Sequence, residues 1–289
     1  MSLWKTTRHE IDLSRPRVMG IVNVTPDSFS DGGRHADAAS ALRHCERLLK
    51  EGADLLDIGG ESTRPGSPAV PLADELARVL PVVRGAVALG APVSVDTSKP
   101  EVMAAVLGLG ADIVNDVWAL RRPGAVEVVA GHPACGVCLM HMHRDPQTMQ
   151  AAPMAGDAVP QVLLFLEQAA QALQARGVQR SRIVLDPGIG FGKTVAQNFA
   201  LLARQDELLA AGYPLLVGWS RKSSIGAAVQ GDAPVPPPEA RVAGSVAAAL
   251  IAVQRGARIV RVHDVRETVQ ALAVWKQVEE TTKIIAASA

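Results

Sequence analysis

One short pattern returns along the chain and limits the possible folds more than any other feature. A helix-like stretch ends at a glycine, a β-prone run follows, and the run ends on polar or turn residues, as in EGADLLDIGG at 51–60 and RGARIVRVHD at 255–264. Further copies begin at Leu89, Leu109 and Ala211. Glycine suits its position because helices commonly end on a left-handed residue, which glycine adopts without strain. The repeat predicts a succession of strand–helix units.

Less regular strand candidates complete the series, at 18–24, 136–142 and 182–186. Between the strands lie amphipathic stretches such as 38–49 and 72–87, whose apolar residues follow helical three-and-four spacing. The chain thus contains eight strand–helix units without interruption.

Eight such units in 289 residues predict a TIM (β/α)₈ barrel. A doubly wound open sheet is the alternative, because alternation of strands and helices does not by itself close a sheet. We expect a single domain over residues 1–289, with residues 1–17 as a short N-terminal extension.

Composition narrows the class of function. Twenty-nine Lys and Arg balance 29 Asp and Glu, and aromatic residues make up only 3%. This excludes the basic surface and stacking platform of a nucleic-acid-binding protein. The longest apolar stretches are too short to span a membrane, and residues 1–17 hold no signal-peptide core. Three cysteines do not make a disulfide framework. We therefore expect a cytoplasmic protein with no membrane partner.

Nearly every predicted strand ends on a polar side chain. Singly, each such residue is more often a turn or cap residue than a catalytic one. In a barrel, however, all of these ends meet at the rim that carries the active site. The sequence therefore predicts a polar site built from Asn23, Asp57, Asp96, Asn115, Asp116, His141, Asp186, Ser220, Arg221, Lys222, Arg261 and His263.

Two long loops follow the first two strands, at 25–33 and 59–68, and both are rich in Gly, Pro and Ser. Each holds one residue unusual for a plain turn, Phe29 in the first and Arg64 in the second. These residues suit lids that close over an anionic substrate. Ordinary surface loops are the alternative.

Several other signals are weak. The run GIGFGKT at 188–194 looks like a phosphate-binding loop, but Pro187 replaces its first glycine, and Lys193 replaces the third glycine of a dinucleotide fingerprint. The CxxC at 135–138 lies partly within an apolar strand, which argues against a redox role. The HMH at 141–143 lacks a third protein ligand for a metal, so a polar role at the rim is favoured.

Longer motifs resemble the signatures of bacterial dihydropteroate synthase. The resemblance extends over roughly residues 18–270. The matching motifs, in chain order, are MGIVNVTPDSFSDGG at 19–33, DIGGESTRPG at 57–66, SVDTSKP at 94–100, ND at 115–116, LMHM at 139–142, DPG at 186–188, SRKS at 220–223 and RVHD at 261–264.

This resemblance implies an enzyme of folate synthesis that joins 6-hydroxymethyl-7,8-dihydropterin pyrophosphate to p-aminobenzoate, giving 7,8-dihydropteroate and pyrophosphate. It also implies a homodimer, Mg²⁺ as cofactor bound through Asn23, and catalytic roles for Asp96 and Lys222. The pterin contacts would be Asp96, Asn115, Met140, Asp186 and Lys222. The pyrophosphate contacts would be Thr63, Arg64, Arg261 and His263. The p-aminobenzoate contacts would be Phe29, Thr63, Pro65, Phe191 and Ser220.

The residue chemistry agrees with these roles. A pterin edge presents fixed donors and acceptors that carboxylates and an amide can satisfy at rigid strand ends. Departing pyrophosphate builds negative charge, which Mg²⁺ and the cations would stabilise. If the C–O bond breaks before the amine attacks, Asp96 is the nearest anion to the cationic methylene. Departures from the family pattern at Trp118, Ile189 and Trp219 affect the expected fit of ligands, not the reaction.

Two other functions compete. A methyltetrahydrofolate:corrinoid methyltransferase would share the pterin site but would not need the Thr63–Pro65 loop or cations at Arg261 and His263. A catalytically silent pterin-binding paralogue would be expected to lose loop residues that remain here.

An apolar surplus on the last helices suits self-association. It comprises Val242, Val246, Leu250, Val269, Leu272 and Trp275.

Overall fold

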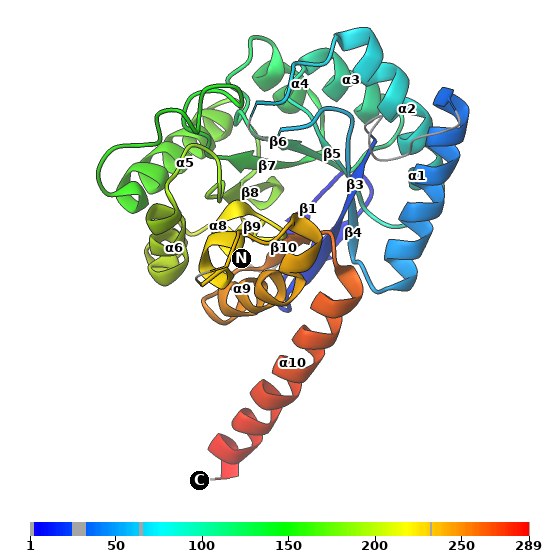
Figure 1. The fold of residues 1–289 in the computed structure, drawn as a ribbon. Coiled ribbons are helices and arrows are strands. Elements are labelled where there is room, and N and C mark those ends of the chain that lie inside the picture. The colour runs from blue at the N-terminus through cyan, green and yellow to red at the C-terminus, as the bar shows by residue number, and fades with distance from the viewer. Residues whose placement is uncertain (1–2, 25–32, 64–65, 232, 289) are drawn as a thin grey trace.

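The chain folds into a ring of parallel strands surrounded by helices (Figure 1). The computed structural model describes residues 3–24, 33–63, 66–231 and 233–288. The strands of the eight-stranded sheet are β3 (Arg17–Asn23), β4 (Leu55–Gly59), β5 (Val93–Asp96), β6 (Ile113–Asp116), β7 (Gly136–Met140), β8 (Ile183–Asp186), β9 (Leu216–Val217) and β10 (Ile259–Val262). All eight strand regions expected from the sequence are present.

The order of the strands identifies the sheet as a barrel. The sheet runs β8-β7-β6-β5-β4-β3-β10-β9, so strands consecutive in the sequence pair, and the first strand, β3, pairs with the last, β10. The remaining gap between β8 and β9 is bridged by a parallel Leu185–Leu215 pair, and the Leu185 N–H donates to the Pro214 carbonyl at 3.0 Å. This order excludes the doubly wound alternative, in which the strand order reverses at an internal point.

The helices cover the outside of the barrel (Figure 1). They are α1 (Gly33–Lys50), α2 (Leu72–Ala88), α3 (Pro100–Gly108), α4 (Ala125–Gly131), α5 (Ala158–Ala175), α6 (Val195–Ala203), α7 (Gln205–Leu209), α8 (Ser223–Val229), α9 (Val242–Gln254) and α10 (Val265–Ser288). The far end of α10 extends away from the body. No helix among the described residues is both long and apolar enough to cross a membrane.

Helix α9 begins at Val242, several residues after the proline-rich run that precedes it. A 3₁₀ turn at Pro238–Arg241 precedes it, and Pro237 is still extended, with φ −64° and ψ 160°. Proline removes a backbone donor and biases the residue before it away from helix. The consecutive prolines at 236–238 therefore delay the start of α9.

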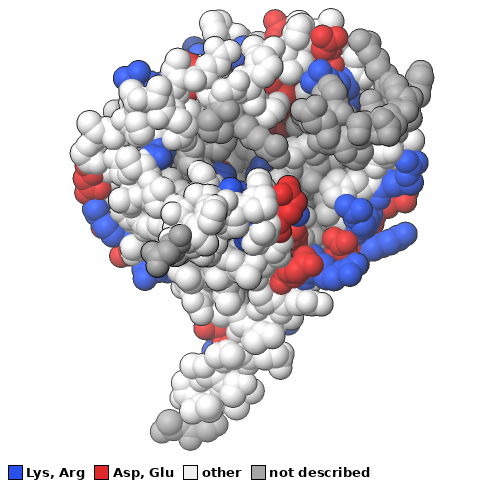
Figure 2. Space-filling model, viewed as in Figure 1, with Lys and Arg blue, Asp and Glu red and all other residues white. Residues whose placement is uncertain are grey.

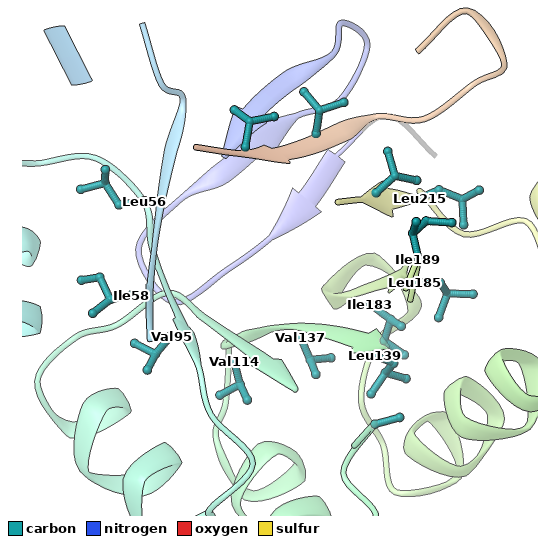
Figure 3. Close-up of a cluster of buried hydrophobic side chains, with 14 of the residues drawn as sticks. Leu56, Ile58, Val95, Val114, Val137, Leu139, Ile183, Leu185, Ile189 and Leu215 are labelled. Atoms are coloured by element: carbon teal, nitrogen blue, oxygen red, sulfur yellow. The ribbon is translucent and has the colours of Figure 1, made fainter. Parts of the chain in front are cut away.

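Alternate residues of each strand face opposite sides of the barrel wall. The outward residues form the main core against the helices, and Figure 3 shows Leu56, Val95, Val114 and Leu139 among them. The inward residues near the strand starts form a second, separate cluster. Its strand members are Met19, Leu55, Ile113, Cys138, Val184, Leu216 and Ile259. The barrel is therefore apolar through its lower half.

An N-terminal hairpin closes the lower end of the barrel. Its strands β1 (Leu3–Lys5) and β2 (Glu10–Asp12) pair antiparallel, and they carry Trp4 and Ile11 into the inner cluster. Trp4 is fully buried, and its indole Nε1–H donates to the Arg182 carbonyl at 2.9 Å. Residues 1–17, expected as a mere extension, thus include the plug of the barrel.

Replacing Trp4 by Ala should lower the free energy of unfolding by about 3–5 kcal/mol, because a large buried ring and its hydrogen bond are lost together. Urea unfolding followed by circular dichroism measures this. The matched control is Leu3→Ala on the other face of β1, where the side chain is exposed and the expected loss is under about 0.5 kcal/mol. Equal losses for the two variants would contradict the plug.

Candidate active site

The upper half of the barrel interior is polar. On four strands, an inward residue of the apolar cluster is followed two positions later by an inward polar residue. These pairs are Leu55 and Asp57, Ile113 and Asn115, Val184 and Asp186, and Ile259 and Arg261. The register places these groups side by side, with Asp96 opposite Asn115 and Met140 opposite Asp186. Figure 2 shows Lys and Arg atoms set back near the middle of this face. The strand alternation therefore stacks a polar site on an apolar plug.

Arg261 joins two acidic strand ends across the barrel. Its Nε–H donates to Asp57 Oδ2 at 2.6 Å, and an Nη2–H donates to Asp96 Oδ2 at 3.0 Å. The Asn115 amide donates to the same Asp57 oxygen at 3.2 Å, whereas Asp57 Oδ1 is buried without a hydrogen-bond partner. The sequence pointed to Asp57 as a polar strand end but assigned it no role. Asp57 and Arg261 are 204 residues apart in the sequence, so no local sequence pattern could predict that they pair.

Burial and charge shape the ionisation of this group. Burial raises the pKa of Asp96 to about 7; the Arg261 guanidinium opposes the shift and the Asp57 carboxylate reinforces it. Burial alone would lower the pKa of Arg261, but the carboxylates of Asp57 and Asp96 outweigh it and hold that pKa above its usual value. Arg261 therefore remains the fixed cation of the site, while Asp96 titrates near neutrality.

A second acid–base pair joins the end of β8 to the start of α8. Asp186 Oδ1 accepts from the Gly188 N–H at 2.7 Å, and burial raises the pKa of this carboxyl against the opposing charge of Lys222. Burial lowers the pKa of Lys222 to about 8, although Asp186 favours its charged form. The Lys222 ammonium donates to the Ile189 carbonyl and lies 4.8 Å from the centre of the Phe191 ring.

Apolar side chains complete the wall beside this pair. Met140 packs in a buried cluster with Val117, Met142 and Met149, and Phe191 lies against the cluster. The structure thus brings the predicted contacts Met140, Asp186, Phe191 and Lys222 to one side of the barrel mouth.

The ends of β9 and β10 are linked by two contacts. Ser220 Oγ lies 3.0 Å from His263 Nδ1 and accepts from the His263 N–H at 3.1 Å. Arg221, in the left-handed region at φ 61°, donates to both carboxylate oxygens of Asp264 at 3.0 and 2.6 Å. This bidentate pair turns Ser220 and Lys222 toward the site, a positioning role that the sequence did not assign to Arg221.

Thr63 lies on the loop after β4, partly buried. Lys99 holds the base of this loop: its ammonium donates to Glu61 Oε2 at 2.5 Å and also to the buried Glu75. The sequence missed Lys99 and Glu75 as supports. The predicted contacts Phe29, Arg64 and Pro65 lie outside the described residues.

A cavity of about 180 Å³ opens beside Asp96. Thr63 lines one side of it, and Trp118 and Arg122 line another. The Arg122 guanidinium lies 5.4 Å from the Trp118 ring centre. Trp118 therefore forms part of the wall of the mouth. Trp219, one of the departures from the family pattern, is buried against Phe199 of α6, with ring centres 5.3 Å apart.

The described side chains form no preassembled metal centre. Among the described residues, no three His, Cys, Asp or Glu side chains gather as a metal site, and the His141 ring contacts Lys193 instead. Asn23 ends β3 at the rim and is partly exposed. One amide oxygen is a suitable protein ligand for Mg²⁺, which usually keeps several waters and is held largely by substrate phosphates.

The three cysteines take no part in the site. Cys45, Cys135 and Cys138 are free and buried, and burial raises the pKa of each thiol. This agrees with the expectation that the CxxC spacing is not a redox motif.

Comparison with known proteins shows close relatives over nearly the whole chain. Residues 19–263 match the family described as pterin binding enzyme. The chain is 50% identical to dihydropteroate synthase from Neisseria meningitidis serogroup B, over 95% of this chain and 96% of that protein.

Solved structures agree. A Xanthomonas albilineans dihydropteroate synthase with 4-aminobenzoic acid has 53% identity and a TM-score of 0.87, covering 93% of this chain and 95% of that one. A Burkholderia cenocepacia dihydropteroate synthase complexed with 7,8-dihydropteroate has 49% identity and a TM-score of 0.87, covering 98% of both chains.

The raised pKa of Asp96 has a consequence for stability. Between pH 3.8 and about 7 the native state keeps a proton on Asp96 that the unfolded chain releases, so this group costs stability as the pH rises through that window. Asp96→Asn removes the titration. Relative to the parent, the variant should gain at least about 1 kcal/mol in free energy of unfolding between pH 4 and pH 7.5.

Urea unfolding across this pH range measures the gain. The control is Asp145→Asn on the same rim, where a hydrogen bond from the Thr148 hydroxyl lowers the pKa and no gain is expected. A difference between Asp96→Asn and the parent that does not change with pH would contradict the assignment.

Proposed function

The chain belongs to the family of pterin binding enzymes, and from that membership we infer that it has dihydropteroate synthase activity in folate synthesis. The substrates are 6-hydroxymethyl-7,8-dihydropterin pyrophosphate and p-aminobenzoate, and the products are 7,8-dihydropteroate and pyrophosphate. The observation that carries this inference is the full-length match, at 49% identity, to an enzyme complexed with 7,8-dihydropteroate. The described polar groups expected for that reaction meet at one barrel mouth in this chain.

The pterin is the ligand that the buried floor of the site fits best. Asp96 and Asn115 offer a carboxylate and an amide on the adjoining strands β5 and β6, Asp186 offers a carboxylate on β8, and Lys222 adds a donor. Because these groups stand on sheet-bound strand ends, their spacing is rigid and can match the fixed donor and acceptor row of a pterin edge. Met140 supplies an apolar surface beneath the ring.

Pyrophosphate belongs nearer the rim, at Arg261 and His263, with Thr63 and Arg64 on the loop after β4. Two of the donor nitrogens of Arg261 are engaged by Asp57 and Asp96, and its Nη1 makes no hydrogen bond within the described residues. That nitrogen can donate to a phosphate oxygen without breaking the existing ion pairs. The cation is thus already oriented when negative charge develops on the leaving group.

p-Aminobenzoate would lie between the rim loops and β9. Phe191 and Ser220 form the described part of this subsite, together with Thr63, while Phe29 and Pro65 complete the assignment from the loops. The Phe191 ring can pack against the benzoate ring, and the Ser220 hydroxyl can donate to its carboxylate. The amine end would then be the end free to reach the pterin methylene.

The chemical step is a substitution at that methylene. The C–O bond to pyrophosphate breaks first, the methylene becomes cationic, and the neutral aromatic amine attacks it and then releases a proton. Asp96 is the anion that would stabilise the cation, and Lys222 holds the pterin in place. The pKa of Asp96, raised to about 7, leaves it largely ionised only above neutral pH, so the reaction should slow as the pH falls below that value.

Mg²⁺ is proposed as the cofactor, with Asn23 as its protein ligand and the substrate pyrophosphate supplying further oxygens. When bound, the ion would neutralise charge on the departing pyrophosphate.

The activity is tested with purified protein, Mg²⁺, dihydropterin pyrophosphate and p-aminobenzoate, by measuring pyrophosphate release and dihydropteroate formation. We expect both products in equal amounts, and no dihydropteroate when p-aminobenzoate is omitted. If no pyrophosphate is released at saturating substrate concentrations, the proposed activity is refuted. A catalytically silent paralogue or a methyltransferase would then be the remaining alternatives.

Asp96→Ala should lower kcat/KM at least about 100-fold, because a preorganised charge beside the developing cation is removed. The same assay measures it. Glu127→Ala is the control, since Glu127 is exposed on α4 and its variant should stay within about twofold of the parent. Dihydropteroate formation by Asp96→Ala at the parent rate would overturn the role of Asp96.

We also propose that two copies of the chain associate through α9 and α10. These helices pack together, and they leave Ile251, Val274, Val278, Ile284 and Ile285 exposed. Val274 and Val278 are one helical turn apart and are 69% and 59% exposed, so they form one continuous apolar strip. A second copy of the same strip would cover it symmetrically.

Val278→Glu places a charge in this strip and should weaken the dimer at least about 30-fold, a loss typical of a central interface residue. Sedimentation velocity over a concentration series measures the change. The control is Leu164→Glu, equally exposed but on α5. A parent that sediments as a monomer, or an unchanged dimer in the Val278 variant, would contradict this interface.

A further inference from the structure

A buried lysine that the proposed reaction does not use lies beneath the loop after β8. The Lys193 side chain is 2% exposed. Its ammonium donates to the Gly188 carbonyl at 2.8 Å, to the Phe191 carbonyl at 3.2 Å and to His141 Nδ1 at 2.9 Å. Carbonyl groups of the loop at 187–193 therefore surround the ammonium group of the loop's own last residue, Lys193. The His141 carbonyl is a fourth, longer contact at 3.4 Å, so all three donors of the ammonium group are engaged.

The same contacts join this loop to the end of β7. His141 follows β7 directly, and its N–H donates to the Asp186 carbonyl at 2.9 Å. The loop approaches this segment so closely that a side chain at Gly188 would collide with the His141 carbonyl. A side chain at Gly192 would come within 2.6 Å of the His143 carbonyl. The glycines permit the approach, and Lys193 supplies the polar contacts that hold it.

The loop supplies two groups to the proposed site. The Ile189 carbonyl accepts a hydrogen bond from the Lys222 ammonium, and the Phe191 ring lies 4.8 Å from the same nitrogen. Asp186 itself ends β8, and the Lys222 backbone caps the start of α8, so neither backbone belongs to the loop. The placement of Phe191, in contrast, depends on the loop and hence on Lys193.

The ionisation of the neighbouring groups fits an ammonium group on Lys193 that donates to its acceptors. His141 is buried against the Phe165 ring, with ring centres 5.0 Å apart, and its Nδ1 accepts, so its imidazole is neutral. Burial, with the charge of Lys193, lowers the pKa of His141 to about 2. The charged groups nearest to Lys193 are Asp186, which favours the ammonium form, and Lys222, which opposes it; burial lowers the pKa of Lys193 to about 7.

We propose that Lys193 is a positioning residue for the p-aminobenzoate subsite, which holds the 187–193 loop against His141 so that Phe191 lies over Lys222. The proposal rests on the proposed function, because it assigns the subsite through Phe191. Lys193 does not touch the reacting atoms and acts only through the loop.

Lys193→Met keeps the unbranched shape and removes the donors. In steady-state assays with each substrate varied, the variant should raise KM for p-aminobenzoate about tenfold, the loss typical of a hydrogen bond to a charged group. Because Asp96 and Asp186 stay on their strands and the Lys222 backbone begins α8, kcat and KM for the pterin substrate should change less than KM for p-aminobenzoate, by under about threefold.

Arg182→Met is the matched control. Arg182 is a buried cation at the opposite ends of β7 and β8, where it donates to the carbonyls of Cys135 at 2.7 Å and Val129 at 3.0 Å. Its loss should lower the thermal midpoint without changing KM for p-aminobenzoate. Equal KM changes in the two variants would mean that Lys193 only stabilises the fold, and would overturn the proposal.

A pair of His141 variants tests the same link if Lys193→Met does not fold. His141→Asn can place an oxygen near the position of Nδ1 and should keep KM for p-aminobenzoate within about threefold of the parent, whereas His141→Leu should raise it about tenfold. Equal KM values for this pair would overturn the proposal. Failure of the proposed function is distinct, because the parent protein itself would then form no dihydropteroate.

Discussion

Closure of the parallel sheet is the constraint on which the rest of the molecule depends. In a closed barrel the inward positions of all strands share one interior, so two successive inward positions on each strand make two layers. The lower layer, with Leu55 and Ile113, is apolar and is sealed by Trp4. The upper layer carries Asp57 and Asn115. The same alternation that builds a core below thus builds a polar site above.

Charge pairing lets that polar layer exist inside a protein. Isolated buried carboxylates would be strongly disfavoured, but Arg261 is shared between Asp57 and Asp96, and Lys222 stands beside Asp186. The pairing remains imperfect: the pKa of Asp96 stays raised and that of Lys222 stays lowered. Shifted pKa values of this kind are typical of sites that bind charged ligands. The bound ligand then completes the charge balance.

Sequence reasoning identified nearly all of the strands and the polar residue that ends most of them, because glycine-terminated helices and β-prone runs are local patterns. It also assigned Asp96, Asn115 and Asp186, which stand where a strand ends. It did not assign the groups that act through contacts distant in sequence. Lys193 was noticed only as a substitute for a glycine, and Lys99 only as part of a motif; their partners His141 and Glu75 lie 52 and 24 residues away.

By itself the sequence determined the class of fold, the rim on which the site lies and, through its long motifs, the family and its reaction. These depend on local periodicity and on runs of adjacent residues. Only the tertiary structure decided which side chains share a charge, which face of the wall a residue occupies and which buried cations serve as supports. Trp219 illustrates the difference: it adjoins Ser220 in the chain, yet it packs outward against Phe199, because successive residues leaving a strand turn to opposite sides of the barrel wall.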